Sequence, residues 1–188
     1  MNKTSKMVMV AIFTSLTAIG GFIRIPLPFV PITLQTFFVL MAGIILGKKS
    51  GALSQLLYVA LGLIGIPIFA GGGGIASIFH PSFGYLLGFI VAAFTVGLLL
   101  EKKQVDFRNT LLVSVVGMAV VYLFGVPYLY FVLNQVTGME ISLFTAIKTG
   151  MLVFLPGDLL KVFILTSIVP DIYKRINPEK QNKLASAR

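Results

Sequence analysis

The sequence predicts an all-α membrane protein with six transmembrane helices. Of its 188 residues, 57% are hydrophobic and only 11% are charged, and the mean hydropathy is +0.98. Soluble domains are about 45–50% apolar and about 25% charged, so this composition indicates an integral membrane protein. Apolar stretches alternate with short polar or proline-rich breaks, and the cations cluster at those breaks. The length suits a single domain.

Each predicted span ends at a break with a local cause. The prolines of "RIPLPFVPIT" end the first span, the turn "GKKSG" separates the second from the third, and the charged loop "EKKQVDFR" separates the fourth from the fifth. The polar turn "NQVTGMEIS" precedes the sixth span, which is predicted to kink or restart at Pro156 and Gly157. The spans cover about 7–23, 33–46, 52–65, 85–100, 110–133 and 143–169.

The segment 66–84, "IPIFAGGGGIASIFHPSFG", is apolar but cannot form one regular helix, because it contains two prolines and four consecutive glycines. Irregular backbone at membrane depth is tolerated only against protein or a water-filled cavity. We therefore expect a glycine-rich loop that covers or lines a cavity.

The cations fix the expected orientation. In a six-span arrangement twelve of the 15 Lys and Arg residues fall on one side and two, Arg24 and Lys148, on the other. The positive-inside rule then places both termini, and the basic tail 170–188, in the cytoplasm. The twelve are Lys3, Lys6, Lys48, Lys49, Lys102, Lys103, Arg108, Lys174, Arg175, Lys180, Lys183 and Arg188. Such clusters at span ends are topology signals, so nucleic acid is not an expected partner.

Composition also excludes several kinds of site. The chain has no cysteine, which rules out disulfides, thiolate metal sites and cysteine nucleophiles. Its one histidine, His80, cannot form a histidine-rich metal site, so no metal is expected.

Asp158 and Lys161 stand out because they interrupt the apolar run "FLPGDLLKVFIL". Three residues apart, they share one face of a helix. A charge at the centre of a membrane helix costs about 2.5–3.5 kcal/mol, so such residues face the interior and usually serve a function. The pair is interpreted as a clamp for a ligand with N–H and C=O groups side by side, such as a urea or amide. A structural ion pair, and an ion or proton relay, are the alternatives, although no other acid lies in a predicted span.

A catalytic role for Asp158 or Ser82 would require a second catalytic residue that the sequence does not supply. An intramembrane aspartyl protease using Asp158 needs a second membrane aspartate, and none is available. A rhomboid-like serine protease using Ser82 needs a histidine on a different helix, whereas His80 lies two residues away. We therefore expect no enzyme. An intramembrane hydrolase and a structural membrane protein with an internal ion pair are kept as the rival hypotheses.

Three stretches together resemble the BioY family, the biotin-specific S components of energy-coupling factor (ECF) vitamin transporters. They are "IPLPFVPITLQTFFVLMAGIILGKKSGALSQLLYVALGLIGIPIFAGGGG", "HPSFGYLLGF" and "LPGDLLK", and the resemblance spans about Met7 to Ile172. It implies a six-helix S-component fold in the cell membrane of a prokaryote that captures biotin with high affinity for import. It also implies partners, namely a membrane coupling protein (the T component) and two cytoplasmic ATPases. The chain itself needs no cofactor, and no G-x-x-x-x-G-K-[ST] loop occurs in it.

The resemblance also assigns roles to residues. Asp158 and Lys161 match the family's biotin-contacting pair: Asp158 accepts from a ureido N–H and Lys161 donates to the ureido oxygen, or alternatively binds the valerate carboxylate. The run Gly71, Gly72, Gly73 and Gly74 matches the loop that caps the pocket and offers backbone N–H groups. Some relatives carry asparagine within this run, where this chain has Gly73, and many carry glycine where it has Phe83.

Two further side chains are candidates from their positions. Gln35 begins the second span beside the proline-rich turn, and Tyr85 begins the fourth. Each is expected either to face the pocket or to lie at the membrane interface.

The first span carries small residues at helical spacing, Ala11, Ser15 and Ala18, with Thr14 beside them. Such a stripe permits close helix approach. It serves either packing within the bundle or, as the resemblance implies, docking of the T component on Ala11 and Ser15.

Overall fold

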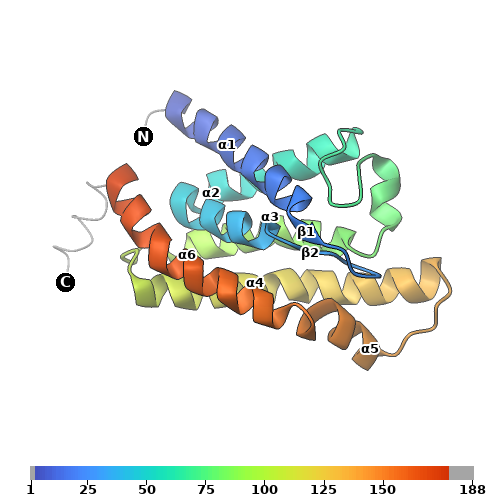
Figure 1. Cartoon of the computed structure of the whole chain (residues 1–188). Helices are drawn as coiled ribbons and strands as arrows, with labels where there is room; N and C mark the ends of the chain where they lie inside the picture. Colours follow the sequence, from blue (N-terminus) through green and yellow to red (C-terminus); the bar gives the residue numbers. More distant parts are fainter. Residues whose placement is uncertain (1–2, 178–188) are drawn as a thin grey trace.

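The computed structural model describes residues 3–177, which form a helical bundle with one short β-hairpin (Figure 1). The helices are α1 (Lys3–Phe22), α2 (Gln35–Leu63), α3 (Phe83–Leu99), α4 (Phe107–Phe131), α5 (Leu143–Ile147) and α6 (Leu155–Ile176). The hairpin joins β1 (Arg24–Ile25) to β2 (Ile32–Thr33). A 3-10 helix covers Ile75–Phe79, and π-helical turns cover Val132–Val136 and Lys148–Leu152.

The helices confirm the prediction of an all-α membrane protein. Within residues 3–177, four helical stretches are long and apolar enough to cross a bilayer. The helix α3 is shorter but equally apolar. The four stretches are Lys3–Phe22, Gln35–Leu63, Phe107–Val136 and Leu143–Ile176.

The helix α2 contains a reversal of the chain at Gly47, which has φ 77° and ψ 177°. Gln35 Nε2 donates to the Tyr58 hydroxyl at 2.6 Å although 23 residues separate them. A straight helix would hold these residues about 34 Å apart, because each residue adds about 1.5 Å. The two parts of α2 therefore lie side by side. The expected five-residue turn is a single glycine with positive φ, a conformation that glycine adopts without strain.

The two ends of the bundle are formed by different segments of the chain. Lys48, just after the reversal, forms a 2.7 Å ion pair with Glu101 in the loop between α3 and α4. Figure 1 shows the start of α1 and the end of α6 at this same end. The β-hairpin, the glycine-rich segment and the loop before α5 lie at the opposite end.

The predicted sixth span is divided into three parts. The helix α5 passes into the π-helical turn Lys148–Leu152, and α6 begins at Leu155 with Pro156 in its first turn. The predicted restart is therefore present. The helix α6 then continues past Pro170 to Ile176, so the first residues of the predicted tail are helical. Residues 178–188 lie outside the described part of the chain.

Glycines let the helices approach closely. A Cβ on Gly51 would lie 2.9 Å from Gly43 Cα, and one on Gly43 would lie 2.6 Å from the Ala93 carbonyl oxygen. A Cβ on Gly97 would overlap the backbone of Lys48. The close packing of α2 against α3 therefore requires residues without a side chain at these positions.

Replacing Gly97→Ala should lower the free energy of unfolding by about 1–3 kcal/mol, the usual cost of overpacking. The matched control is Gly157→Ala, because a Cβ there meets nothing within 4 Å. In a helix that change should be neutral or slightly stabilising. Thermal unfolding in detergent measures both, and equal shifts would contradict this packing.

Candidate functional site

Asp158 and Lys161 form an ion pair on α6, with Lys161 Nζ 2.6 Å from Asp158 Oδ1. The side chains are 6% and 13% exposed, respectively, so both charges are largely enclosed by protein. Asp158 lies in the first turn of α6. The positive end of the helix dipole favours a carboxylate at this position. The α6 N-terminus therefore helps to stabilise a charge that its apolar surroundings disfavour.

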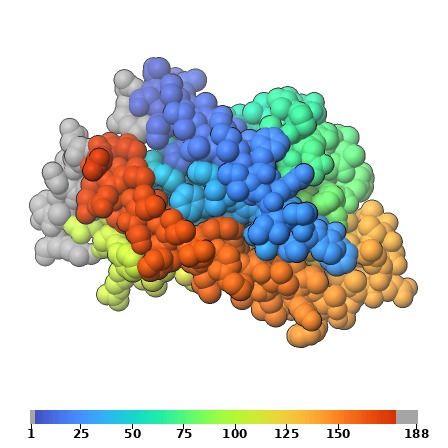
Figure 2. All heavy atoms as spheres, viewed as in Figure 1, coloured from blue at the N-terminus to red at the C-terminus, as the bar shows by residue number. Residues whose placement is uncertain are grey.

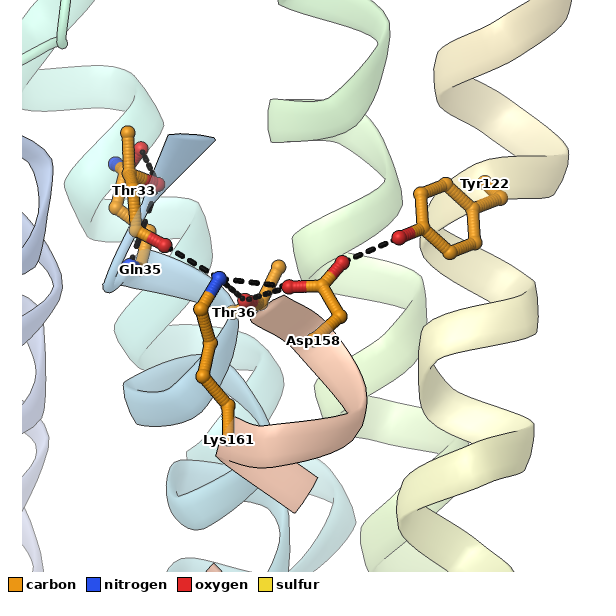
Figure 3. A network of polar contacts seen from close by, with 6 residues as sticks. All are labelled: Thr33, Gln35, Thr36, Tyr122, Asp158 and Lys161. Carbon is orange, nitrogen blue, oxygen red and sulfur yellow. Dashed lines mark hydrogen bonds and ion pairs between the residues drawn. The ribbon is translucent and has the colours of Figure 1, made fainter. Parts of the chain in front are cut away.

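Every proton of the Lys161 ammonium has an acceptor (Figure 3). Besides Asp158, Lys161 Nζ donates to the Thr33 carbonyl oxygen of β2 at 2.6 Å and to Thr36 Oγ1 of α2 at 3.2 Å. An ammonium has three N–H donors. A ligand that accepts from Lys161 must therefore take the place of one of these partners.

Asp158 keeps one acceptor position for a ligand. Its Oδ1 accepts from Lys161 and, at 3.3 Å, from Thr36 Oγ1, while Oδ2 accepts from the Tyr122 hydroxyl of α4. An ionised carboxylate has about four lone-pair sites. These three bonds thus leave room for one more donor on Oδ2. The pair can therefore accept one hydrogen bond from a ligand. It can donate another if the ligand replaces one of the present acceptors of Lys161.

The ion pair lies in the wall of a small cavity with a free volume of about 60 Å³. Ligand pockets combine apolar walls with a few polar groups and typically measure about 300–1,000 Å³, so this cavity has the lining of a ligand pocket but must widen to hold a ligand of that size. All four predicted side chains border this cavity, together with apolar residues from α3, α4 and the β-hairpin. Its lining is Val30, Pro31, Thr33, Gln35, Thr36, Phe69, Ala70, Ser82, Tyr85, Leu86, Phe89, Val121, Tyr122, Phe154, Asp158 and Lys161.

The hairpin closes one side of this cavity. Figure 2 shows the blue segment that contains β1 and β2 lying against the orange start of α6. Gln35 fixes this arrangement, because its Oε1 accepts from Thr33 Oγ1 at 3.1 Å while its Nε2 donates to Tyr58. Gln35 is 3% exposed. Both ends of its amide thus hold the hairpin to α2, so Gln35 shapes the cavity wall.

Tyr85 presents its ring to the cavity and its hydroxyl elsewhere. The hydroxyl donates to the Gly150 carbonyl oxygen at 2.6 Å, within the π-helical turn Lys148–Leu152. A Cβ on Gly125 would overlap the Tyr85 ring, so the ring occupies space that glycine leaves open. Tyr85 is therefore an apolar wall and a tie between α3 and the π-helical turn.

The glycine run does not border the cavity that contains the ion pair. Phe69 and Ala70 border it instead, while Gly71 and Gly73 line a neighbouring cavity with Phe83 and His80. Gly72 N donates to the Phe69 carbonyl and Gly74 N to the Gly62 carbonyl, so these N–H groups are used within the loop.

Gly73 leaves no room for a side chain. A Cβ on Gly73 would overlap the Ile66 carbonyl, so the asparagine that some relatives carry in this run would not fit at Gly73 in this conformation.

His80 and Ser82 contact each other, but only within a turn. His80 Nδ1 lies 2.7 Å from Ser82 Oγ and also accepts from the Ser82 N–H at 3.3 Å. Among residues 3–177 no carboxylate is hydrogen-bonded to His80, and no group of three or more potential metal ligands occurs. The contact stabilises the loop and lacks the third group that orients a catalytic histidine.

The small residues of α1 are predicted to serve either packing within the bundle or docking of a partner, and they divide between a buried and an exposed face. Thr14 and Thr17 are buried, and their hydroxyls contact the Ser54 carbonyl at 2.9 Å and Gln55 Oε1 at 3.2 Å. Ala11 and Ser15 are exposed on another face of the helix. Packing within the bundle therefore uses the threonines and leaves Ala11 and Ser15 available.

Comparison with known proteins gives a family. The model of the BioY family matches residues 1–178. The chain belongs to the BioY family. It is accordingly a transport subunit and not an enzyme.

Relatives in this family match over almost their full length. A "Probable biotin transporter BioY" of Lysinibacillus sphaericus is 37% identical, over 96% of this chain and 93% of the relative. The "Biotin transporter BioY" of Thermotoga maritima is 40% identical, over 87% and 92%. A crystal structure described as "the S-component for biotin from an ECF-type ABC transporter" superposes with a TM-score of 0.80 and 33% identity, covering 93% of this chain and 95% of that one.

Three residues that bind the ion pair in the structure were not predicted from the sequence. Thr33, Thr36 and Tyr122 bind the ion pair from β2, α2 and α4. Threonine and tyrosine are ordinary in membrane helices, so nothing in their local sequence distinguishes them. The sequence held one indirect signal: two buried charges require further hydrogen-bond partners, so other polar side chains had to lie near the pair.

Replacing Lys161→Met should lower the free energy of unfolding by about 3–5 kcal/mol, since it leaves Asp158 buried without its cation. Adding Asp158→Asn should recover most of that loss. Lys174→Met is the control, because Lys174 pairs with Asp171 at the same spacing on the same helix but is exposed. Exposed pairs contribute about 0–1 kcal/mol. A loss at Lys161 no larger than at Lys174, measured by unfolding in detergent, would contradict the burial of the pair.

Proposed function

We propose that this protein binds biotin as the substrate-capture subunit of an ECF-type transporter that imports the vitamin. The observation that carries the proposal is the enclosed Asp158–Lys161 pair, which has one free acceptor position and an exchangeable donor beside apolar walls. Membership of the BioY family supports it, since relatives are described as biotin transporters.

The ureido ring of biotin matches the pair chemically, because it carries two N–H groups and one C=O side by side. Asp158 Oδ2 accepts from one N–H. Lys161 donates to the ureido oxygen in place of Thr36 or the Thr33 carbonyl. Charge-assisted hydrogen bonds of this kind are stronger than neutral ones, so two of them orient the ring.

The valerate carboxylate is the alternative partner of Lys161. It matches the ammonium by charge. The ureido assignment is preferred because Asp158 and Lys161 lie 2.6 Å apart and so present an acceptor and a donor together.

The lining of the cavity suits the apolar part of the ligand, once the cavity widens to admit it. The side chains of Phe69, Tyr85, Phe89 and Phe154 supply apolar surface around the pair. The run Gly71–Gly74 covers the outer side, and Gly71 and Gly73, beside the second cavity, supply backbone groups there.

The proposed orientation follows from the cations. Both termini and the end marked by Lys48 and Glu101 lie in the cytoplasm of a prokaryotic cell, and the chain crosses the plasma membrane six times. The glycine-rich loop and the cavity mouth then face outward. The T component docks on Ala11 and Ser15, and two cytoplasmic ATPases hydrolyse ATP to drive the cycle.

Biotin binding to the purified protein tests the proposal. Hydrogen bonds to charged groups contribute about 1.5–3 kcal/mol, so Asp158→Asn and Lys161→Ala should each weaken binding by roughly tenfold to a hundredfold. The matched controls are Asp171→Asn and Lys174→Ala, which have the same residue types and spacing on the same helix but lie exposed, and these should bind normally. Calorimetry measures all five affinities.

Two results would contradict the proposal. A well-folded unchanged protein that does not bind biotin would exclude the ligand. Undiminished binding by both Asp158→Asn and Lys161→Ala would leave the pair with a purely structural role.

Docking of the T component is tested separately. Ala11→Trp and Ser15→Trp should abolish assembly, measured by co-purification. Biotin binding should be unchanged, because both residues are exposed and no residue of α1 lines the cavity. Leu112→Trp is the control, since Leu112 is exposed on α4 rather than on α1. Assembly that survives both changes, or is lost equally with Leu112→Trp, would contradict the docking face.

A further inference from the structure

The glycine-rich cap, residues 64–84, exposes several large apolar side chains. Ile64 is 77% exposed, Ile75 74%, Phe79 64% and Ile66 42%. Figure 2 shows the teal and green cap at the molecular surface. Exposed apolar patches on a protein mark a surface that binds another apolar partner.

The backbone brings the two halves of this surface together. Gly74 N donates to the Gly62 carbonyl at 2.7 Å, and Gly73 packs directly on the Ile66 carbonyl. Ile64 and Ile66, which follow the end of α2, therefore lie beside Ile75 at the start of the 3-10 helix. The backbone thus holds together the two segments that carry Ile64, Ile66 and Ile75, although they are separate in sequence.

The length of α3 places this patch at membrane depth. The 17 residues of α3 rise about 26 Å, whereas the hydrocarbon core is about 30 Å thick. The far end of α3 is marked by Glu101 and its ion pair with Lys48, which belong in water. The cap at the other end of α3 therefore begins before the hydrocarbon core ends. The stretch Phe107–Val136 is much longer and, in Figure 1, extends past the cap.

The cap can enter an apolar medium at little cost. Residues 64–84 contain no Asp, Glu, Lys or Arg. Their single titratable group is the His80 imidazole, and burial lowers the pKa of His80 below its usual range, which favours the uncharged form. Hydrogen bonds within the cap join Phe69 to Gly72, Ser77 to Gly74 and His80 to Ser77. Backbone groups that are satisfied internally are what the bilayer requires.

We infer that the outer face of the cap, formed by Ile64, Ile66, Ile75 and Phe79, is seated in the bilayer leaflet at this end of the bundle, at the boundary between acyl chains and head groups. The partner is the lipid bilayer itself. The inner side of the cap is held by protein, because the Phe69 ring packs edge-on against Tyr58 with centroids 5.4 Å apart. Lifting the cap from the cavity then requires both that aromatic contact and the lipid contacts to be exchanged. The inference concerns the cap and the membrane only and holds whatever ligand the cavity binds.

Depth-dependent quenching in liposomes tests the inference. Because the chain has no cysteine, single variants Ile75→Cys and Ile64→Cys can carry one environment-sensitive fluorophore each. Glu140→Cys is the water-side control at the same end, and Phe163→Cys, in the middle of α6 and 60% exposed, is the lipid-side control. Each variant is first shown to keep the thermal stability of the unchanged protein.

Lipids with a quencher near the head group should quench the fluorophore at Ile75 and Ile64 several-fold more strongly than at Glu140. Lipids with a quencher deep in the acyl chain should act mainly at Phe163. Iodide in the water should show the opposite order. The inference would be overturned if the lipid quenchers and iodide each quenched the fluorophore at Ile75 and Ile64 as they do at Glu140. Either cap position is enough for this test if the other variant fails to fold.

Discussion

Two opposite charges enclosed in an apolar bundle impose the arrangement of the elements around them. Removing one partner of a buried pair costs about 3–5 kcal/mol, and even an intact pair needs further hydrogen bonds to offset desolvation. Here the further bonds come from three elements distant in sequence: a β2 carbonyl, an α2 hydroxyl and the Tyr122 hydroxyl of α4. The proline-rich hairpin is thereby held over the first turn of α6. Because these bonds converge on one ion pair, the charged groups of the cavity lining lie together.

Glycine residues, which have no side chain, make that convergence possible. Gly47 lets α2 reverse within one residue, which brings Gln35 to Tyr58 and so secures the hairpin. Gly125 leaves the space that the Tyr85 ring occupies, and Gly150 accepts the bond from its hydroxyl. A π-helical turn and Pro156 interrupt the last membrane segment just before Asp158, so that this residue lies at a helix N-terminus. The carboxylate is consequently stabilised by the helix dipole as well as by its partners.

The sequence predicts those features that depend on residues close together along the chain. Hydropathy and cation placement predicted a helical membrane protein, and the charges in "FLPGDLLKVFIL" identified Asp158 and Lys161. Family resemblance, which rests on long motifs, was confirmed by the family match. Thr36 and Tyr122 were missed because their importance comes from helices that pack together only in three dimensions. The role of Gln35 as a tie within the cavity wall, and the absence of Gly71–Gly74 from that wall, likewise depend on how the hairpin and the cap fold back.

The central claim is that Asp158 and Lys161 together hold the ureido ring, and a ligand cycle tests it most directly. Binding free energies are measured for biotin and for biotinamide, whose valerate carboxylate is a neutral carboxamide, with the unchanged protein and with Lys161→Ala. If Lys161 donates to the ureido oxygen, the substitution weakens both ligands by the same factor. A loss confined to biotin, with biotinamide affinity unaffected by Lys161→Ala, would place Lys161 on the carboxylate and contradict the account.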